Sequence, residues 1–572
     1  MKKKIQIIIN GKKIRTQEGK SIFEVSQENG IEIPTLCFHS DLKIRASCRI
    51  CVVEIKGKKE LATACSTKIE PGMEINTYSQ RVKRARKINL ELIFAQHCEE
   101  CYDCVWSFNC RLLILAREYG VKITRFPDRK PCHSFAQFGP SLLFDSSKCM
   151  NCWNCVEVCE KQAVNFLEQE EKDGFFEVIP SKNPKRDCVY CGQCILHCPV
   201  GAFEAVGEFE GVEAPLKEKN KVVIFQFAPS IRTSIGEEFN LPYGSIVTEK
   251  LVAGIKKLGA SKVFDTSVGA DFTSVEEAKE LVEKMENKSS PCLSSCCPAW
   301  VKFVEFYYPE FVSCLATTRS PQIILGGLIK NYWAKKEKID PRKIVVVSVM
   351  PCVAKKYEIR REELKIGGLK PVDYVLTTRE LAYLFKKHKI DLNKIAPKKA
   401  DNPFGLPSGG GVIYGASGGV AESAFRTAYL QITKKKLPRI EFKEMRGMEG
   451  MKKAKIKIGG KTVKLAVVNG LANAKKILEE LKKNPKAYDA VEVMACFGGC
   501  IGGGGQPVPT DGMIRRKRAE SLYDIDAKKE IRLAHENPVV KKIYKDFLTS
   551  KEIIHRICHT KYFPKKKEVN FK

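Results

Sequence analysis

The sequence predicts a multidomain α+β and α/β protein, in which small cysteine-rich domains precede a larger α/β domain with parallel sheets. The chain has 572 residues, enough for several separate cores. Of its 25 cysteines, 17 lie within the first 198 residues. From about residue 212, apolar strand-like segments alternate with amphipathic helical segments, as in a parallel sheet covered by helices. We expect four domains, over residues 1–80, 81–130, 131–211 and 212–572.

Composition and charge restrict where the protein acts and what it contacts. The apolar run in the N-terminal MKKKIQIIINGKKI is too short for a signal peptide, and no stretch of about 18 apolar residues predicts a membrane span. We therefore expect a cytoplasmic protein without membrane contact, whose reduced thiolates can bind metal. The net charge of +31 fits either a solvated lysine-rich surface or a docking surface for acidic electron carriers. Nucleic-acid binding is disfavoured because the basic residues are scattered rather than clustered.

The first domain is expected to consist of short strands around four cysteines. These are Cys37, Cys48, Cys51 and Cys65, in a C-x10-C-x2-C-x13-C series. A tight loop of thiolates with one distant thiolate can hold a 2Fe-2S cluster. The pattern resembles plant-type ferredoxins, which implies a β-grasp fold, although its first gap is longer than theirs. Structural zinc is the alternative for this segment alone.

The second domain carries one histidine among its candidate ligands. His97 and Cys101 lie one helical turn apart, and Cys104 and Cys110 follow. One imidazole and three thiolates resemble the small 4Fe-4S site, with one His and three Cys ligands, of NADH-dehydrogenase subunits. A neutral imidazole removes one negative charge from the ligand set and is expected to raise the cluster potential. Zinc is again the alternative.

The third domain contains an internal repeat of C-x2-C-x2-C-x3-C. The first run supplies Cys149, Cys152, Cys155 and Cys159, and the second supplies Cys188, Cys191, Cys194 and Cys198. This spacing is that of the bacterial ferredoxins with two 4Fe-4S clusters, in which the fourth cysteine of each run ligates the other cluster. We therefore expect Cys198 to complete the first cube and Cys159 to complete the second.

Three short segments of the fourth domain carry candidate chemistry. They are SSCCPAW at 294–300, MPCVAKKYE at 350–358 and EVMACFGGCIGGGGQP at 492–507, and together they hold five cysteines. The second segment directly follows an apolar strand, as does Ala228-Pro229-Ser230, and ligands of parallel sheets bind at the carboxyl ends of strands. Four thiolates can bind a cube, which leaves one over. The glycines of the third segment allow the backbone to approach a bulky ligand closely.

These three segments resemble the active-site signatures of the FeFe hydrogenases, and the whole chain is similar to their long, multi-cluster clostridial-type form. The resemblance implies an H-cluster, a 4Fe-4S cube bridged through Cys500 to a two-iron centre with carbonyl, cyanide and dithiolate ligands. It implies that the cube ligands are Cys297, Cys352, Cys496 and Cys500. The implied reaction is the reversible reduction of protons to H2 with electrons from ferredoxin, which is the activity of a ferredoxin hydrogenase. One 2Fe-2S cluster and three accessory 4Fe-4S clusters would carry those electrons.

The resemblance also implies roles for residues around the two-iron centre. Cys296 would present a free thiol to the dithiolate, Lys355 would hydrogen-bond one cyanide, and Ser230 would approach the other. The remaining pocket residues implied by the family are Ala228, Pro229, Pro321, Gln322, Met350, Pro351, Tyr414, Gly415 and Met494. An ordinary core role is the alternative for each methionine. The implied partners are an acidic ferredoxin or flavodoxin, H2 and protons, and hydrogenase maturation proteins.

A proton relay through Cys296 is a further implication of the resemblance. Glu277 and Glu280 match the two glutamates of the family's relay and lie one helical turn apart, although an exposed helix face is the ordinary reading of such a pair. Where the family has a relay serine, this chain has Ala316, with Thr317 beside it. Either the Thr317 hydroxyl or ordered water is expected to take the place of the serine.

Three other functions share much of this pattern. A catalytic subunit of an electron-bifurcating hydrogenase that uses NAD and ferredoxin is the main alternative, and its nicotinamide would bind a partner subunit because no nucleotide-binding fingerprint is present here. A hydrogen sensor is disfavoured because Cys296 is retained. A cluster-assembly relative without the two-iron centre is disfavoured because Lys355 and the GGGGQP run are retained.

Overall fold

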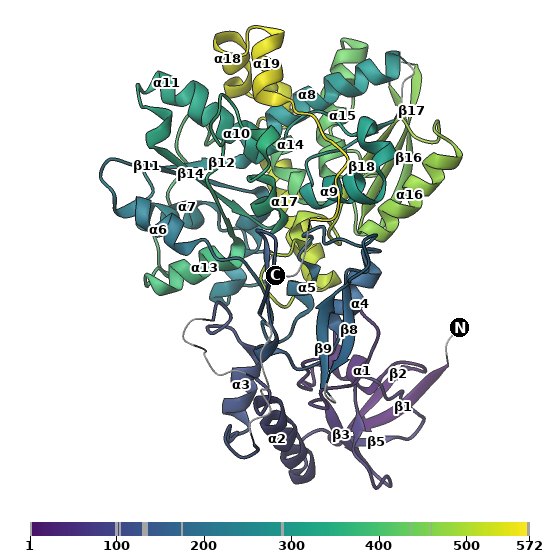
Figure 1. The fold of residues 1–572 in the computed structure, drawn as a ribbon. Coiled ribbons are helices and arrows are strands. Elements are labelled where there is room, and N and C mark those ends of the chain that lie inside the picture. The colour runs from purple at the N-terminus through teal and green to yellow at the C-terminus, as the bar shows by residue number, and fades with distance from the viewer. Residues whose placement is uncertain are drawn as a thin grey trace.

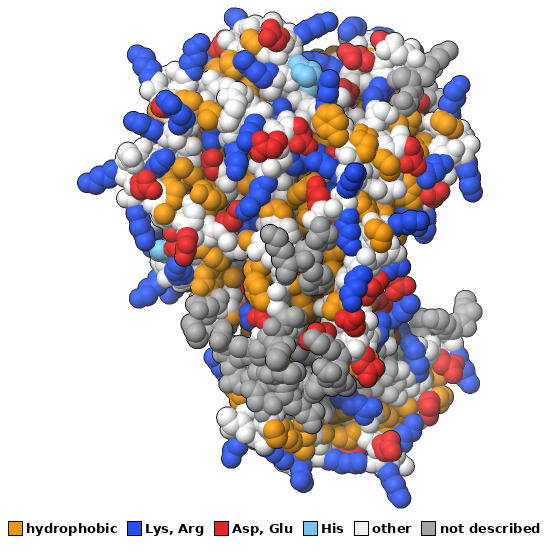
Figure 2. Space-filling model, viewed as in Figure 1, with side chains coloured by type: hydrophobic (Ala, Val, Ile, Leu, Met, Phe, Trp, Pro, Cys, Tyr) orange, Lys and Arg blue, Asp and Glu red, His pale blue; other side chains and the backbone are white. Residues whose placement is uncertain are grey.

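The structure, a computed structural model, describes residues 3–97, 101, 104–127, 135–172, 175–287, 291–435, 437–458 and 460–568. In Figure 1 the cysteine-rich N-terminal part lies below the larger α/β part. Cys98 and Cys132, for which the sequence predicts no role, lie outside the described residues. Within those ranges, no helix combines the length and the apolar character needed to cross a membrane. Figure 2 shows basic side chains spread over the visible face and interspersed with acidic ones.

A five-stranded sheet with one helix forms the N-terminal domain, which agrees with the ferredoxin-like fold expected there. Its strand order is β2-β1-β5-β3-β4. In β1, Ile5, Ile7 and Ile9 are buried in alternation with less buried residues, so one face of the strand packs on the core. The elements are β1 (Lys4–Ile9), β2 (Lys12–Gln17), α1 (Ile22–Glu28), β3 (Val52–Ile55), β4 (Ala62–Thr63) and β5 (Glu74–Asn76).

Two helices and then a ferredoxin-like repeat follow. Each cysteine run of the repeat contains one short helix, α4 or α5, and both helices begin directly after a residue in the left-handed region, Trp153 (φ 63°) or Gly192 (φ 70°). The sequence repeat is therefore also a backbone repeat. The elements are α2 (Gln80–Phe94), α3 (Arg111–Glu118), β6 (Phe135–Phe138), β7 (Leu142–Asp145), α4 (Asn154–Lys161), β8 (Leu167–Lys172), β9 (Phe175–Pro180), α5 (Gln193–His197) and β10 (Phe203–Ala205).

The α/β part is built on two four-stranded sheets. The first has the order β12-β11-β14-β15 with every pair parallel, and the second has the order β13-β18-β17-β16 with only the β16–β17 pair antiparallel. All seven residues of β14 are buried, as expected for a strand covered on both faces. The strands are β11 (Val222–Phe227), β12 (Lys262–Asp265), β13 (Cys292–Leu293), β14 (Ile344–Met350), β15 (Tyr374–Thr377), β16 (Met451–Ile458), β17 (Lys461–Asn469) and β18 (Ala490–Met494).

Helices surround both sheets, and α8 and α14 lie between them in Figure 1. The expected strand–helix alternation is thereby confirmed. The helices are α6 (Phe209–Lys217), α7 (Thr248–Lys257), α8 (Thr266–Glu286), α9 (Pro298–Tyr307), α10 (Pro321–Leu328), α11 (Ala334–Lys336), α12 (Ala354–Glu358), α13 (Thr378–Lys387), α14 (Gly409–Val412), α15 (Gly419–Thr433), α16 (Leu471–Lys483), α17 (Gly512–Lys528), α18 (Pro538–Asp546) and α19 (Lys551–Cys558). One apolar cluster extends from the ferredoxin-like repeat into the second sheet, so these parts share a core.

Candidate active site

The carboxyl ends of strands from both sheets meet at one cavity. Ala228 follows β11, Pro351 follows β14 and Ala495 follows β18, and all three line the cavity. Its volume is about 700 Å³. The predicted pocket residues that line it are Ala228, Pro229, Ser230, Cys296, Cys297, Pro321, Gln322, Met350, Pro351, Cys352, Lys355, Tyr414, Gly415, Met494, Cys496 and Cys500. Segments that are far apart in the sequence thus converge at the carboxyl ends of the strands, where parallel α/β sheets usually bind their ligands.

Four of the lining cysteines are buried together at the cavity. Burial raises the pKa of the Cys352 thiol to about 12 and raises the pKa values of Cys297, Cys496 and Cys500 above the ordinary thiol value. Bare thiolates would therefore be costly here, whereas bound metal supplies the compensating positive charge. This donor set fits a buried iron–sulfur cube.

Lys355 and Glu358 form a buried ion pair at the cavity. Lys355 Nζ donates to Glu358 Oε2 at 2.9 Å and to the carbonyl oxygen of Cys296 at 3.0 Å. Burial lowers the pKa of Lys355, but the neighbouring Glu358 carboxylate outweighs burial and raises it. Glu358 also accepts from Ser320 Oγ at 3.0 Å and from Gln322 Nε2 at 2.5 Å. The family resemblance assigned Lys355 to a cyanide, and Glu358 was not identified as its partner, although their i,i+3 spacing is visible in the sequence.

Two polar atoms that line the cavity have no hydrogen-bond partner among the described residues. They are the Ser230 hydroxyl oxygen and Gln322 Oε1, and both residues are buried. Buried polar groups are normally satisfied, so such a pair at one cavity indicates a bound group. The Ser230 hydroxyl can donate to an acceptor such as cyanide, and Gln322 Oε1 can accept from an amine. These atoms fit the two-iron centre that the family resemblance implies.

Glycine is required at two positions near Cys500. A side chain on Gly503 would place its Cβ 2.2 Å from the carbonyl oxygen of Pro351. Gly499 has a φ of 96°, and a Cβ there would lie 2.7 Å from the Ser417 nitrogen. The loop that carries Cys496 and Cys500 therefore closes on its neighbours only without side chains at these positions.

The candidate relay residues lie on α8 and beside it. Glu277 is 6% exposed, and its Oε1 has no hydrogen-bond partner among the described residues. Burial, with Glu280 and Glu492 adding to it, raises the pKa of Glu277 well above the ordinary carboxyl value. Glu277 and Ala316 line a second cavity of about 380 Å³, together with Ser294 and Glu492. Thr317 Oγ1 donates to Glu280 at 2.9 Å. The exposed-helix reading of this glutamate pair is excluded, because both carboxyls are largely buried.

The ferredoxin-like repeat places its cysteines in two groups. Cys198 is close enough to Cys149, Cys152 and Cys155 to raise the pKa values of their thiols, in addition to the larger effect of burial. Cys159 acts in the same way on the thiols of Cys188, Cys191 and Cys194. The fourth cysteine of each run therefore lies with the first three of the other, which is the arrangement that two exchanged cubes need.

In the other two candidate cluster sites, cysteines lie close enough to affect the pKa values of one another's thiols. Cys51 Sγ lies 3.3 Å from Cys65 Sγ, and the Cys48 amide donates to Cys37 Sγ at 3.5 Å. His97 is buried, and its Nδ1 lies 2.9 Å from the Lys148 carbonyl oxygen. A carbonyl only accepts, so this bond requires a proton on Nδ1 and orients the ring as in many metal-binding histidines. Cys110 is the residue before α3 and is buried, and Cys101 and Cys104 are half-buried.

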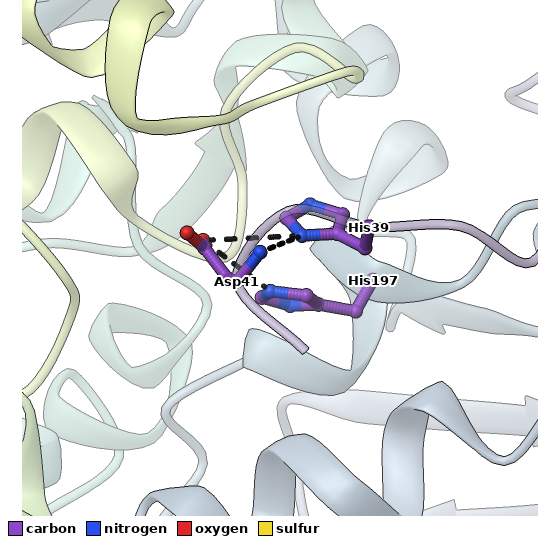
Figure 3. Close-up of side chains that lie close together, drawn as sticks. All are labelled: His39, Asp41 and His197. Atoms are coloured by element: carbon purple, nitrogen blue, oxygen red, sulfur yellow. Dashed lines mark hydrogen bonds and ion pairs between the residues drawn. The ribbon is translucent and has the colours of Figure 1, made fainter. Parts of the chain in front are cut away.

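A histidine–aspartate cluster that sequence reasoning missed joins three parts of the chain. Figure 3 shows His39, Asp41 and His197 side by side, with the two imidazole centroids 4.1 Å apart. Asp41 pairs with Arg515 at 2.7 and 2.9 Å, so its carboxylate already has a cation. His39 is two residues after Cys37 and His197 precedes Cys198, which is the sequence signal that was available. We call His39, Asp41, His197 and Arg515 the interdomain clasp.

Comparisons with known families match every part of the chain that carries candidate ligands. The family described as iron only hydrogenase large subunit, C-terminal domain, matches residues 221–504, and the iron hydrogenase small subunit family matches 512–565. The 2Fe-2S iron–sulfur cluster binding domain matches residues 2–80, and the 4Fe-4S dicluster domain matches 148–202. The iron–sulfur binding region of NADH-ubiquinone oxidoreductase G matches residues 86–125.

Individual relatives extend over nearly the whole chain. The NADP-reducing hydrogenase subunit HndD of Solidesulfovibrio fructosivorans is 38% identical, over 98% of this chain and 99% of its own length. Iron hydrogenase 1 of Clostridium pasteurianum is 38% identical, over 97% of this chain and 99% of its own length. A solved structure of an apo FeFe-hydrogenase from Chlamydomonas reinhardtii is 35% identical with a TM-score of 0.57, and the match covers 63% of this chain and 99% of that one.

Proposed function

Because this chain belongs to the iron-only (FeFe) hydrogenase family, with 2Fe-2S and 4Fe-4S domains ahead of its catalytic domain, we propose that it catalyses the reversible reduction of protons to H2 with electrons from reduced ferredoxin. The observation that carries the proposal is the cavity at the strand ends. It holds four cysteines suited to a cube, a fifth thiol, a buried ammonium and two polar atoms that have no hydrogen-bond partner within the described part of the chain.

The proposed H-cluster site assigns a task to each of these groups. Cys297, Cys352, Cys496 and Cys500 would hold the cube, and Cys500 would bridge to the two-iron centre. When bound, this group supplies the redox chemistry that joins protons and electrons as H2. Lys355, fixed by Glu358, can make a charge-assisted hydrogen bond to a cyanide, which a neutral side chain could not match. The burial of the site excludes bulk water from it.

Proton delivery is assigned to Glu280, Glu277 and Cys296, in that order from the surface. Glu277 suits the middle position because its raised pKa favours a proton-carrying, neutral carboxyl. Glu277 lies close enough to Cys296 to raise the pKa of its thiol, in addition to the larger effect of burial. The cavity beside Ala316 has Glu277, Ser294 and Glu492 as polar neighbours, so ordered water there is our candidate for the missing serine hydroxyl. Thr317 bonds Glu280 instead.

Electron delivery is assigned to the four N-terminal clusters. We propose that residues 1–80 hold a 2Fe-2S cluster, 81–130 a 4Fe-4S cluster with His97, and 131–211 two cubes, ahead of the catalytic domain at 212–572. The second cube would lie next to the active site, because Cys191 raises the pKa of the Cys496 thiol and the Cys191 carbonyl oxygen is 3.8 Å from Cys496 Sγ. A cytoplasmic location, where thiols stay reduced, is part of this proposal.

A second candidate function concerns the electron donor. The relative named as an NADP-reducing hydrogenase subunit is as similar to this chain as the clostridial enzyme is. This chain could therefore be the catalytic subunit of a bifurcating complex, in which a partner subunit binds the nicotinamide. If so, the chain purified without its partner subunits would not oxidise NADH or NADPH.

The test of the proposal is hydrogen formation by the purified chain, produced together with hydrogenase maturation proteins. We expect H2 from reduced ferredoxin without any further subunit. H2 formation from a dye donor but not from ferredoxin, restored by flavoprotein subunits with NADH, would favour the bifurcating complex. No H2 from any donor would contradict the proposed function.

A further inference from the structure

The outer end of the proposed proton route is a hydrogen-bonded network around Glu280. Glu280 Oε1 accepts from Thr318 Oγ1 at 2.6 Å and from Thr317 Oγ1 at 2.9 Å. Glu280 Oε2 accepts from the Thr317 amide at 2.8 Å. The side chain of Glu280 is 12% exposed, and both of its oxygens already accept from Thr317 or Thr318, so we expect a proton to reach it through this network.

His559, just after α19, connects this network to the outside. Its Nδ1 lies 2.8 Å from Thr317 Oγ1 and 3.3 Å from Glu280 Oε1. Its Nε2 lies 3.1 Å from Glu276 Oε2. The side chains of His559 and Glu280 are equally exposed, at 12%, whereas Glu276 is 3% exposed. The His559 ring also lies beside that of the exposed His555, so it joins the molecular surface to a buried carboxyl. An imidazole with one nitrogen on each of two carboxylates can hold a proton at either end.

Several charged or titratable groups face His559. They are Glu276, Lys279 and Glu280 of α8, Arg319, Tyr544 of α18 and His555 of α19. Lys279 Nζ and the Tyr544 hydroxyl both bond Glu276 Oε1. Burial lowers the pKa of His559, but its bonds to Glu276 and Glu280 outweigh burial and raise it to about 9.

The imidazole is not needed to hold this segment in place. Main-chain bonds hold the segment: Thr318 and His559 form an antiparallel bridge, and the Thr560 amide donates to the Thr317 carbonyl at 2.8 Å. Arg319 also bonds carbonyl oxygens there, through its amide to Cys558 at 2.7 Å and through Nε to His559 at 2.6 Å. The ring of His559 bonds Glu276 and Glu280 in addition to these main-chain bonds, so anchoring alone does not explain an imidazole at this position.

We propose that His559 is the group that exchanges protons between the solvent and Glu280. The inference rests on the proposed function and extends its route by one residue. The imidazolium passes its Nδ1 proton to Thr317 Oγ1 while the Thr317 hydroxyl passes its own proton to Glu280 Oε1. Neutral imidazole then takes a proton from solvent water, so the step moves one proton and no electrons. For H2 oxidation the same transfers run in reverse.

The test compares His559→Gln with His555→Gln in the holoenzyme. His555 is an exposed histidine whose ring stacks 5.8 Å from that of His559, so the control removes a neighbouring imidazole without touching Glu280. We expect dye-linked turnover to fall by about 10²-fold in H559Q, the low end for a positioned acid or base, and to stay unchanged in H555Q. Wild-type turnover should decline as pH rises through about 9, and this limb should be missing in H559Q. Free imidazole should partly restore His559→Ala.

A second readout does not depend on turnover. Exchange of the imidazole Cε1 hydrogen, followed by mass spectrometry, should report a pKa of about 9 for His559 in the folded chain. A pKa near the ordinary 6.5, or an H559Q enzyme with the wild-type rate and pH profile, would overturn the inference alone. A wild-type holoenzyme without turnover would overturn the proposed function and the inference together.

Discussion

Cys296 and Cys297 are neighbours in the chain but have different surroundings. Backbone groups of Ala495, Trp300 and Ala299 hydrogen-bond the Cys297 thiol and offset part of the rise in pKa that burial causes. Lys355 faces both thiols, but the Cys296 thiol also faces Glu277, and burial raises its pKa well above the ordinary value. The first environment suits a fixed metal ligand and the second suits a thiol that keeps a proton. The two residues are therefore expected to respond differently to substitution.

Substitution of each of these two adjacent cysteines tests the difference. Cys296→Ala should retain the iron content of the purified protein but lose at least about 10²-fold in turnover, because it removes a proton carrier and no iron bond. Cys297→Ala should lower the iron content, because a cube needs four protein thiolates. Iron analysis and H2 formation on the same samples measure both effects. An iron-poor Cys296→Ala protein would show that this thiol is a ligand after all.

The elements around the interdomain clasp determine how the first domain meets the rest. The loop after Cys37 provides His39 and Asp41, α5 provides His197, and α17 provides Arg515. Asn154 of α4 adds a link, because its Nδ2 donates to the carbonyl oxygens of both Cys37 and His197 at 3.1 Å. Two loops that carry candidate cluster ligands are thus joined through one buried amide. The clasp holds the N-terminal domain close to the ferredoxin-like repeat.

Asp41→Asn tests the clasp. The Asp41–Arg515 side chains are only 14% and 8% exposed, so losing the charge of one partner should cost about 3 kcal/mol of stability. Denaturant unfolding followed by the visible absorbance of the clusters measures this loss. Asp340→Asn is the matched control, since Asp340 pairs with Arg342 at an exposed site, and it should leave the unfolding midpoint unchanged. Equal midpoints for both variants would show that the clasp does not stabilise the domain contact.

Much of this architecture was predictable from local sequence patterns. Each cysteine spacing, and each of the loops after β14 and β18, lies within one short segment of the sequence. The cluster domains and the cavity formed by three segments could therefore be expected. The interdomain clasp and the bonds of Glu280 to Thr318 and His559 could not, because they join residues up to 474 positions apart. Long-range contacts of this kind depend on how whole elements pack, which no local period records.

At the scale of the whole molecule, the charge distribution bears on the electron donor. The net charge is +31, but Figure 2 shows basic side chains spread over the visible face rather than gathered at one place. Steering of an acidic ferredoxin would then depend on the overall field, which salt screens over a Debye length of about 10 Å at 0.1 M. A small neutral dye would not feel this field.

Salt dependence should therefore separate the two donors. We expect the rate of H2 formation from reduced ferredoxin to fall steeply with ionic strength, and the dye-linked rate to change little. Steady-state rates at several salt concentrations with each donor measure the difference. If both rates respond equally, the positive charge has no docking role.

We propose that the cavity at the strand ends holds an H-cluster. Infrared spectroscopy of the chain, purified after production with hydrogenase maturation proteins, tests it most directly, because carbonyl and cyanide bound to iron absorb where protein groups do not. We expect bands from both ligands in the wild-type chain, and their loss in Cys500→Ala, which removes the proposed bridge between the cube and the two-iron centre. A wild-type chain with a full complement of iron–sulfur clusters but without carbonyl and cyanide bands would contradict the claim.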